Sequence, residues 1–522
     1  MRTPGELRSF GVSRNLLISF GLLIVALFAS YKAAQAILAG DLTSLAYAAI
    51  LFVGGAVVIA ILNDWRRGLY TLVAWILFED FVRKYLGNNM AIYFAKDALA
   101  IILYISFFRA RGAKQVSLLR IPFRMPLLIF IWFCLVQIFN PASTSLFYGI
   151  LGAKVDFLYV PLIYVGYALI RSEEDLHRFF SFTCILILIV AGLGLAQSII
   201  GPTFLNPSHL QADIRELSTS YRVAPISGLV AYRPTSVFVS GGRFIDFLEV
   251  SWVIALGYAG YLLLRSRRGR TLAFTTVGVV AAASVMSASR GAFLWNSGIG
   301  LVVVAGFLWG APWRQREVLR VLRAIQRAAL MVGIGIILLL TIFPEQLSSR
   351  LAIYSETLRL DSPTSELVHR TQTYPLQQLA FAFDHPRWPY GYGLGTCTLG
   401  IQYVIRIMRA QPMGVGVESG MGNIVVELGI LGLILWIFLG LSMAYSAWRV
   451  ANELRGTPWF PFGFTIFLFA TIVFFPMTFT GATYQDFVVN SYLWLLLGIL
   501  YRLRTFPKAI QFAQTGTVAS RG

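Results

Sequence analysis

Residues 424–443 read IVVELGILGLILWIFLGLSM and carry a single charged side chain, Glu427. A helix that crosses the hydrocarbon core of a bilayer needs about 20 predominantly apolar residues. Inside lipid every backbone N–H and C=O group has to be satisfied within the segment, which a helix achieves. This stretch therefore predicts a transmembrane helix, and similar apolar runs recur along the chain.

The composition agrees with this interpretation. Of the 522 residues, 57% are hydrophobic and 13% are charged, whereas about 25% are charged in an average soluble domain. A soluble protein could not bury so much apolar surface. The composition predicts an all-helical, polytopic membrane protein and excludes a disordered chain, a fibrous repeat and a disulfide scaffold. The three cysteines form no CxxC pair, the four histidines are scattered, and the sequence has no P-loop and no HExxH motif, so we expect no metal and no cofactor.

We predict about fourteen transmembrane helices in a single integral membrane domain that covers residues 1–522. An even number of crossings places both termini on the same side of the membrane. The predicted spans are centred near Ile24, Val53, Ala74, Ala100, Ile131, Phe157, Ile187, Ile254, Val279, Val302, Gly335, Leu433, Phe467 and Leu495.

The net charge of +19 indicates the orientation of these helices. In a soluble protein such a charge would suggest a nucleic-acid partner. In a membrane protein, arginine and lysine accumulate in the short cytoplasmic loops. When the N-terminus is placed inside, every short loop on that side is basic, for example Arg66-Arg67 and the loop from Arg265 to Arg270. The pattern predicts that both termini are cytoplasmic, and we expect no binding to nucleic acid.

Two long segments are then predicted on the outer, periplasmic side: residues 201–242 and residues 344–420. The second segment contains two stretches with the apolar spacing of a helix. They are Leu376 to Phe383 and Ile401 to Met408. Short amphipathic helices of this kind can lie along a membrane surface.

The outer segments are rich in arginine, although the positive-inside rule predicts that arginine accumulates on the cytoplasmic side. Arg233 lies in the first segment, Arg370 in the second, and Arg290 in the tight turn Ser289-Arg290-Gly291. A guanidinium group offers planar, paired donors that match phosphate oxygens. These residues either hold a diphosphate headgroup or form ordinary salt bridges. For Arg290 the binding role is favoured, because a charge held at the membrane boundary is costly.

Two outer side chains are candidates for acid–base chemistry. His385 precedes the glycine run GYGLG at 391–395, whose backbone can approach a ligand closely. Histidine exchanges a proton near neutral pH, so His385 is either a general base or a cap at a helix end. Glu418 stands just before an apolar run and can accept a proton from a hydroxyl group. For Glu427, within that run, a helix–helix hydrogen bond is the better explanation.

Several other charged residues interrupt the apolar runs. Charged groups inside a membrane are either functional or bound to a partner on a neighbouring helix. They are Glu79, Asp80, Lys96, Asp97, Lys154, Asp156 and Glu249.

Taken in order, these motifs resemble the O-antigen ligase and O-antigen polymerase superfamily of bacterial membrane glycosyltransferases. The similarity covers about residues 190–440. The motifs are YRPTSVF at 232–238, SRGA at 289–292, Arg370 upstream of the 385–395 run, and Glu418 followed by ELGILG at 427–432.

The resemblance implies metal-independent, inverting glycosyl transfer at the periplasmic face of the bacterial inner membrane. The donor would be a polyprenyl-diphosphate-linked glycan, with Arg233, Arg290 and Arg370 at its diphosphate. The acceptor would be a glycan or a lipid, as in O-antigen or exopolysaccharide synthesis, and polysaccharide assembly proteins would be further partners. Ligases of the family carry a histidine near the end of the long loop, where this chain has Glu418. Either Glu418 or His385 is the base, or the acceptor differs, as in a polymerase.

The main alternative is a flippase for lipid-linked oligosaccharides or another transporter. Flippases also have many spans and basic cavities. Transporters commonly show internal repeats and a binding site near the membrane midplane. In this chain the two halves look unlike each other, and the candidate residues lie toward one face. The sequence therefore favours an enzyme.

Overall fold

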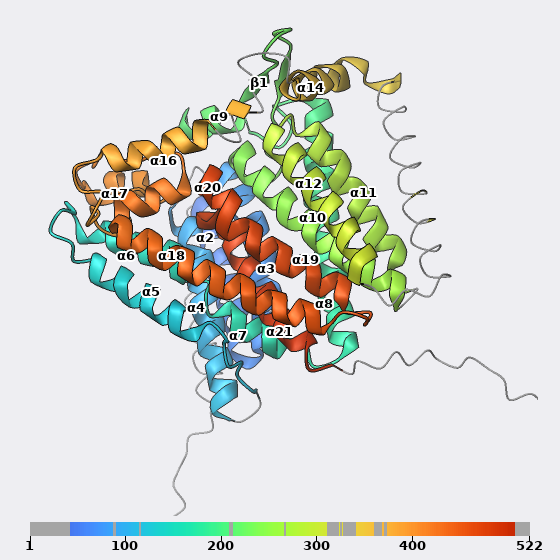
Figure 1. Cartoon of the computed structure of the whole chain (residues 1–522), viewed down its shortest axis with the longest axis horizontal. Coiled ribbons are helices and arrows are strands. Elements are labelled where there is room, and N and C mark those ends of the chain that lie inside the picture. The colour runs from blue at the N-terminus through green and yellow to red at the C-terminus, as the bar shows by residue number, and fades with distance from the viewer. Residues whose placement is uncertain are drawn as a thin grey trace, which may run out of the picture. The chain divides into compact units, whose positions relative to one another are not determined.

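The computed structural model describes residues 42–506, except 87–89, 114–115, 208–211, 266–267, most of 311–340 and most of 360–372. The described chain is mostly helical, with one two-stranded sheet (Figure 1). It divides into two compact units. The first comprises Met1–Val73 and Ala95–Val116, and the second comprises Ala74–Phe94 and Ser117–Gly522.

Seven helices in the described part are long and apolar enough to cross a membrane, in agreement with the predicted class of protein. They are α4 (Met90–Gly112), α6 with α7 (Leu146–Leu169), α8 (Glu173–Ile200), α10 (Gly241–Leu264), α12 (Arg290–Gly310), α18 (Gly420–Glu453) and α19 with its continuation (Phe460–Thr480).

The other predicted spans fall into three groups. The first group consists of shorter apolar helices: Val53–Asn63 within α2 (Leu42–Asn63), α5 (Arg124–Gln137), α11 (Arg270–Met286) and α21 (Phe487–Leu503). Helix α3 (Trp65–Tyr85) is long but carries several charges and is not one of the seven. The spans predicted near Ile24 and Gly335 lie outside the described residues. The number fourteen therefore stays a prediction.

The first unit contains α2, the start of α3 and most of α4. The ring of Trp65 on α3 packs edge-on against Phe107 on α4, with 5.2 Å between the ring centroids. The hydroxyl of Ser106 donates to the carbonyl of Leu62 at the end of α2. These contacts hold the three helices of this unit together.

In the second unit, glycines let neighbouring helices pack closely. Helix α7 (Leu162–Leu169) packs along α21, and a Cβ at Gly166 would collide with the carbonyl of Leu495. A Cβ at Gly498 would collide with the carbonyl of Ile163 in the same way. Without a strong hydrophobic drive between helices in lipid, such small residues favour association by allowing close van der Waals contact.

A small subdomain covers one end of the second unit. The segment after α8 forms α9 (Ala212–Ser218) and the hairpin of β1 (Tyr221–Val223) and β2 (Val230–Tyr232), in which Tyr221 pairs with Tyr232. Helix α14 (Pro344–Thr357) packs on β2 and on the ends of α11 and α12. Figure 1 shows α9, β1 and α14 together at this end, which we call the hairpin end.

Residues 344–420 contain the two helices predicted from apolar spacing. They are α16 (Tyr374–Asp384) and α17 (Ile401–Met408), which confirms both predictions of helix. Helix α17 packs on α6 (Leu146–Phe157), where Ile401 and Ile405 lie against a buried cluster that includes Tyr148 and Leu151. Their position relative to a membrane surface stays a prediction.

The glycine run at 391–395 packs into a break in helix α18. The backbone leaves helical geometry at Gly429, where φ is 73°. There the N–H of Gly393 donates to the carbonyl of Glu427 (2.9 Å), and the N–H of Ile430 donates to the carbonyl of Trp388 (3.1 Å). A Cβ at Gly391 would overlap the backbone of Glu427. We expected these glycines to approach a ligand; their close approach is instead to another segment of the chain.

Candidate functional site

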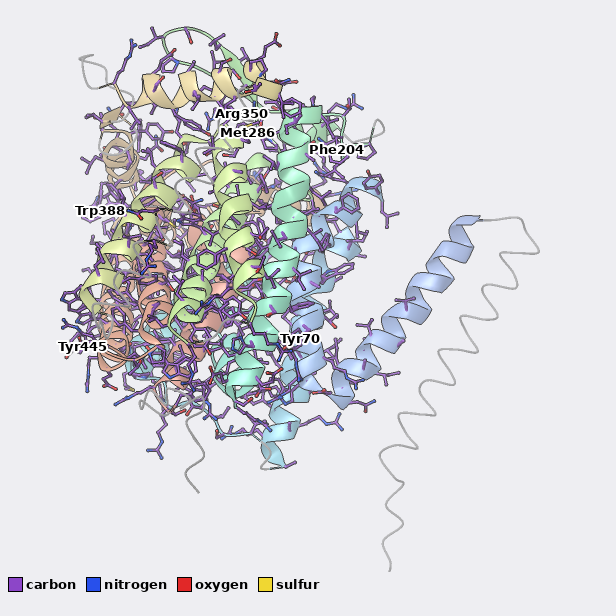
Figure 2. The ribbon with its side chains drawn as sticks, turned by 90° about the vertical axis from the view of Figure 1, so that its right-hand side faces the viewer. Tyr70, Phe204, Met286, Arg350, Trp388 and Tyr445 are labelled. Atoms are coloured by element: carbon purple, nitrogen blue, oxygen red, sulfur yellow. The ribbon has the colours of Figure 1, made fainter. Side chains whose placement is uncertain are left out.

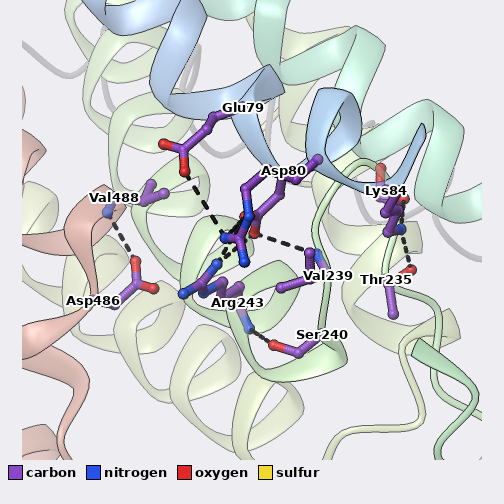
Figure 3. A network of polar contacts seen from close by, with 11 residues as sticks. Glu79, Asp80, Lys84, Thr235, Val239, Ser240, Arg243, Asp486 and Val488 are labelled. Carbon is purple, nitrogen blue, oxygen red and sulfur yellow. Dashed lines mark hydrogen bonds and ion pairs between the residues drawn. The ribbon is translucent and has the colours of Figure 1, made fainter. Parts of the chain in front are cut away.

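Arg233 follows strand β2 and begins a turn that hydrogen bonds from two buried side chains hold in place. The Oε1 atom of Gln197, on α8, accepts hydrogen bonds from the N–H groups of Thr235 (2.8 Å) and Ser236 (2.7 Å). The Nζ atom of Lys84, on α3, donates to the hydroxyl of Thr235 (2.9 Å; Figure 3) and the carbonyl of Ser236 (3.0 Å). The turn that presents Arg233 is therefore fixed by buried hydrogen bonds.

The guanidinium group of Arg233 is half-buried. Among the residues that the structure describes, none accepts a hydrogen bond from it, and its Nε is buried. Burial and, to a lesser extent, the charge of Arg222 lower the pKa of Arg233 to about 10, although the charge of Asp246 acts in the opposite direction. The group is still cationic at neutral pH. A buried, unsatisfied charged donor costs more than the 1–3 kcal/mol of a neutral one, so an anion would stabilise this site.

Arg290 approaches the same hairpin from the start of helix α12. Its Nη2 donates to the carbonyl of Val223 in strand β1 (3.3 Å). Arg222, the neighbour of Val223, pairs with Ala231 across the hairpin, two residues before Arg233. The structure therefore brings two of the three predicted phosphate-binding arginines to one hairpin. The third, Arg370, lies outside the described residues.

Arg350, on α14, is another arginine of the hairpin end, and each nitrogen of its guanidinium group donates a hydrogen bond. It donates to the carbonyls of Met286 (2.8 Å), Ser198 (3.0 Å) and Tyr232 (3.4 Å). Figure 2 shows Arg350 and Met286 next to each other at this end. Burial lowers the pKa of Arg350. Its contacts tie α14 to α8, α11 and β2, which indicates a structural role.

Beside this turn lies a network of buried ion pairs (Figure 3). The Nη1 atom of Arg243, near the start of α10, lies 2.6 Å from Asp80 on α3. Asp80 is fully buried and also accepts hydrogen bonds from Arg83 (2.9 Å) and from the N–H of Val239 (3.3 Å). Asp80 was expected either to be functional or to bind a partner on a neighbouring helix. Its contact with Arg243 on α10 supports the second role.

Helix α10 carries a line of charges beside this network. Arg243, Asp246 and Glu249 recur every third residue and so lie on one face of the helix. The carboxylate of Asp246 interacts electrostatically with four groups, which are Arg233, Arg243, Glu249 and Asp486. Asp486 itself caps helix α21 by accepting the N–H of Val488 (2.8 Å). The start of α10 also packs against Arg233, because a Cβ at Gly241 would lie 3.4 Å from the Cβ of Arg233.

The two predicted acid–base residues lie beside α16 and α18. His385 directly follows α16 and is half-buried. Its ring contacts that of Tyr392 edge-on, with 6.0 Å between the ring centroids. Glu418 is exposed, and its backbone N–H donates to the side chain of Gln378 on α16 (3.0 Å). Within the described residues, neither side chain contacts Arg233 or Arg290.

Glu427 has the structural role that its sequence context favoured, but with a different partner. Its buried carboxylate accepts hydrogen bonds from the N–H groups of Gly395 (3.1 Å) and Cys397 (2.7 Å) and from the hydroxyl of Thr398 (3.0 Å). The partner is thus the loop after the glycine run, and no second helix is involved in these bonds. Glu427 fastens that loop to α18.

Sequence reasoning missed Asp246 and the pairing of Arg243 with Asp80. One signal was present: three charges at a spacing of three residues in an otherwise apolar run predict a polar helix face. No sequence signal connects Arg243 to a residue 163 positions earlier. In comparisons with known proteins, no family model and no curated protein matches this chain.

Proposed function

We propose that the protein transfers a glycan from a polyprenyl-diphosphate carrier to a glycan or lipid acceptor at the periplasmic face of a bacterial inner membrane. It would act as a polymerase or ligase of O-antigen or exopolysaccharide. One observation carries the proposal: the cationic guanidinium of Arg233 is half-buried without a hydrogen bond to any described residue, on a fixed turn. Arg290 adds a second guanidinium at the same hairpin.

The chemistry of such a transfer fits this arrangement. A diphosphate is a good leaving group, and the charge that develops on it can be stabilised by guanidinium groups. Because Gln197 and Lys84 hold the turn, the donors of Arg233 need little reorganisation during the reaction. The energy comes from the glycosyl–phosphate bond of the donor, so no nucleotide is required.

The test is a transfer assay with purified protein reconstituted in sealed proteoliposomes. The protein is incubated with a panel of polyprenyl-diphosphate-linked oligosaccharides and candidate acceptors, and the products are sized. A ladder of products would identify a polymerase and a single shift a ligase. A protein that moves the donor across the bilayer without forming product would be the flippase considered above, and this outcome would refute the proposal.

The arginine variants test the site assignment. We expect Arg233→Ala and Arg290→Ala each to lower transfer about 100-fold or more, the usual cost of removing one preorganised charge-stabilising donor. We expect Arg370→Ala to behave in the same way. Arg359→Ala, which removes an exposed arginine after α14, is the matched control and should keep its activity. Equal activity in the Arg233, Arg290 and control variants would show that these arginines do not form the diphosphate-binding site.

A further inference from the structure

Asp246 differs from the other carboxylates near Arg233. It is half-buried, and within the described structure it forms no hydrogen bond and no ion pair. Asp80 is bound by two guanidinium groups, and Asp486 caps a helix. Glu249 is 4% exposed and lies one turn further into the helix bundle. Asp246 is thus the carboxylate of this group that combines accessibility with free acceptor atoms.

Neither neighbouring arginine is paired with Asp246 in the described structure. Arg243, one turn before it, is held on Asp80 by bonds of 2.6 and 2.9 Å from one nitrogen. Arg233 interacts with Asp246 electrostatically but forms no hydrogen bond with it. A partly buried carboxylate and a guanidinium that do not bond to each other are each left unsatisfied, which is costly in a protein interior. A site that retains both groups can use one for an anion and the other for a proton.

We propose that Asp246 is the general base of this site and takes the proton of the acceptor hydroxyl. This inference rests on the proposed function. In the step, the O–H bond of the acceptor breaks and its proton passes to the Asp246 carboxylate. The hydroxyl oxygen forms a bond to the anomeric carbon while the bond from that carbon to the phosphate oxygen breaks. The electron pair of that bond leaves with the polyprenyl diphosphate, whose charge is stabilised at Arg233.

The position of Asp246 suits this role better than that of the two candidates expected from the sequence. The described contacts of Glu418 and His385 are with α16 and with Tyr392. Asp246, in contrast, lies on the first turns of α10, which begin beside Arg233: a Cβ at Gly241 would lie 3.6 Å from the Nε of Arg233. A base has to reach the hydroxyl that attacks beside the diphosphate, so it should lie near the diphosphate-binding arginine.

The test compares three variants of the full-length protein. With the donor that the panel identifies, Asp246→Asn should lower transfer on the order of 100-fold or more, the usual contribution of a general base. Asp246→Glu should restore part of the activity, because it keeps a carboxylate on the same face. Glu345→Gln, the control, changes an exposed carboxylate at the start of α14 and should stay within about three-fold of wild type.

Two further measurements separate a base from a structural residue. Binding of glycan-free polyprenyl diphosphate should be kept or tightened in Asp246→Asn, because one negative charge has been removed, and should be lost in Arg233→Ala. The rise of wild-type transfer with pH should disappear in Asp246→Asn. The groups that face Asp246 are Arg233, Arg243, Glu249 and Asp486, so their charges set the midpoint of that rise.

The outcomes distinguish this inference from the proposed function. If wild type transfers glycan and Asp246→Asn transfers equally well, Asp246 is not the base and the function stands. If Glu418→Gln or His385→Ala loses more activity than Asp246→Asn, the role moves to that residue. If Asp246→Asn loses lipid-diphosphate binding together with transfer, the residue is structural and the inference fails. If wild type neither binds polyprenyl diphosphate nor forms product, the proposed function fails first.

Discussion

At the scale of single residues, the hairpin end shows how packing divides chemically identical side chains into different roles. Arg350 gives its guanidinium donors to backbone carbonyls of other segments, whereas Arg233 gives none to the described residues. In the sequence both are arginines of long outer segments, and no local pattern separates them. Their roles depend on which carbonyls the folded chain brings within reach, and this is a long-range property.

Arg350→Ala tests whether the hydrogen bonds of Arg350 stabilise the fold. The truncation would leave the buried carbonyls of Met286 and Ser198 without their donor, and we expect it to lower the free energy of unfolding by about 3 kcal/mol. Thermal unfolding of the detergent-solubilised protein measures the effect. Arg290→Ala should lose transfer while keeping its Tm within a few degrees of wild type. A stable Arg350→Ala variant would contradict the structural role.

Glu427 illustrates what the sequence can predict at this scale and what it cannot. A carboxylate in an apolar run has to be satisfied, so a structural hydrogen bond was predictable. Its partners, Gly395, Cys397 and Thr398, are about thirty positions away in the chain. They reach Glu427 because α18 breaks at Gly429, and a glycine in an apolar run does not by itself indicate a break.

At the scale of elements, the contact between α12 and α19 depends on small residues. A Cβ at Gly306 would overlap the ring of Phe464, and one at Gly310 would overlap the ring of Phe460. Gly298, on the same helix, has no atom within 4 Å of its Cβ position. Close helix packing in membranes uses small residues in this way.

These two positions provide a matched pair of substitutions. Gly306→Ala should lower the Tm, because the added methyl group displaces the Phe464 ring and overpacking costs about 1–3 kcal/mol. Gly298→Ala should leave the Tm unchanged or raise it slightly, since alanine favours a helix over glycine by about 1 kcal/mol. Thermal unfolding of both variants in the same detergent checks the prediction. A lower Tm in Gly298→Ala than in Gly306→Ala would show that this interface is wrongly described.

Hydropathy predicted the long helices α8, α10 and α18 because each contains an 18-residue stretch of high mean hydropathy. It was less informative for α21, which has 17 residues and is buried along nearly its whole length. A helix that is apolar on nearly all sides shows no preferred face in its sequence. The neighbours of α21, which are α7 and α19, could therefore not be predicted. The break in α18 and the hairpin β1–β2 were missed for a different reason, because both are fixed by contacts with distant segments.

At the scale of the whole chain, the second unit carries polar clusters at both ends of its helices. The hairpin end holds Arg233, Arg290 and Arg350. At the other end of α10, Arg265 pairs with Glu173 at the start of α8 (3.1 Å). Short basic loops at this second end agree with the predicted cytoplasmic side, because arginine and lysine accumulate there. The hairpin end would then be periplasmic, as the proposed function requires.

Cysteine labelling tests this orientation directly. Of the native cysteines, Cys134 and Cys184 are buried and Cys397 is partly buried, so Cys397→Ser gives a background with little reactivity. Ser227, in the hairpin turn, and Asn452, near the end of α18, are both exposed. We expect Ser227→Cys to react with a membrane-impermeant maleimide in intact cells, and Asn452→Cys to react only after the inner membrane is permeabilised. The opposite pattern would place Arg233 on the cytoplasmic side, where a periplasmic acceptor cannot reach it, and would therefore exclude both the proposed transfer and the role of Asp246.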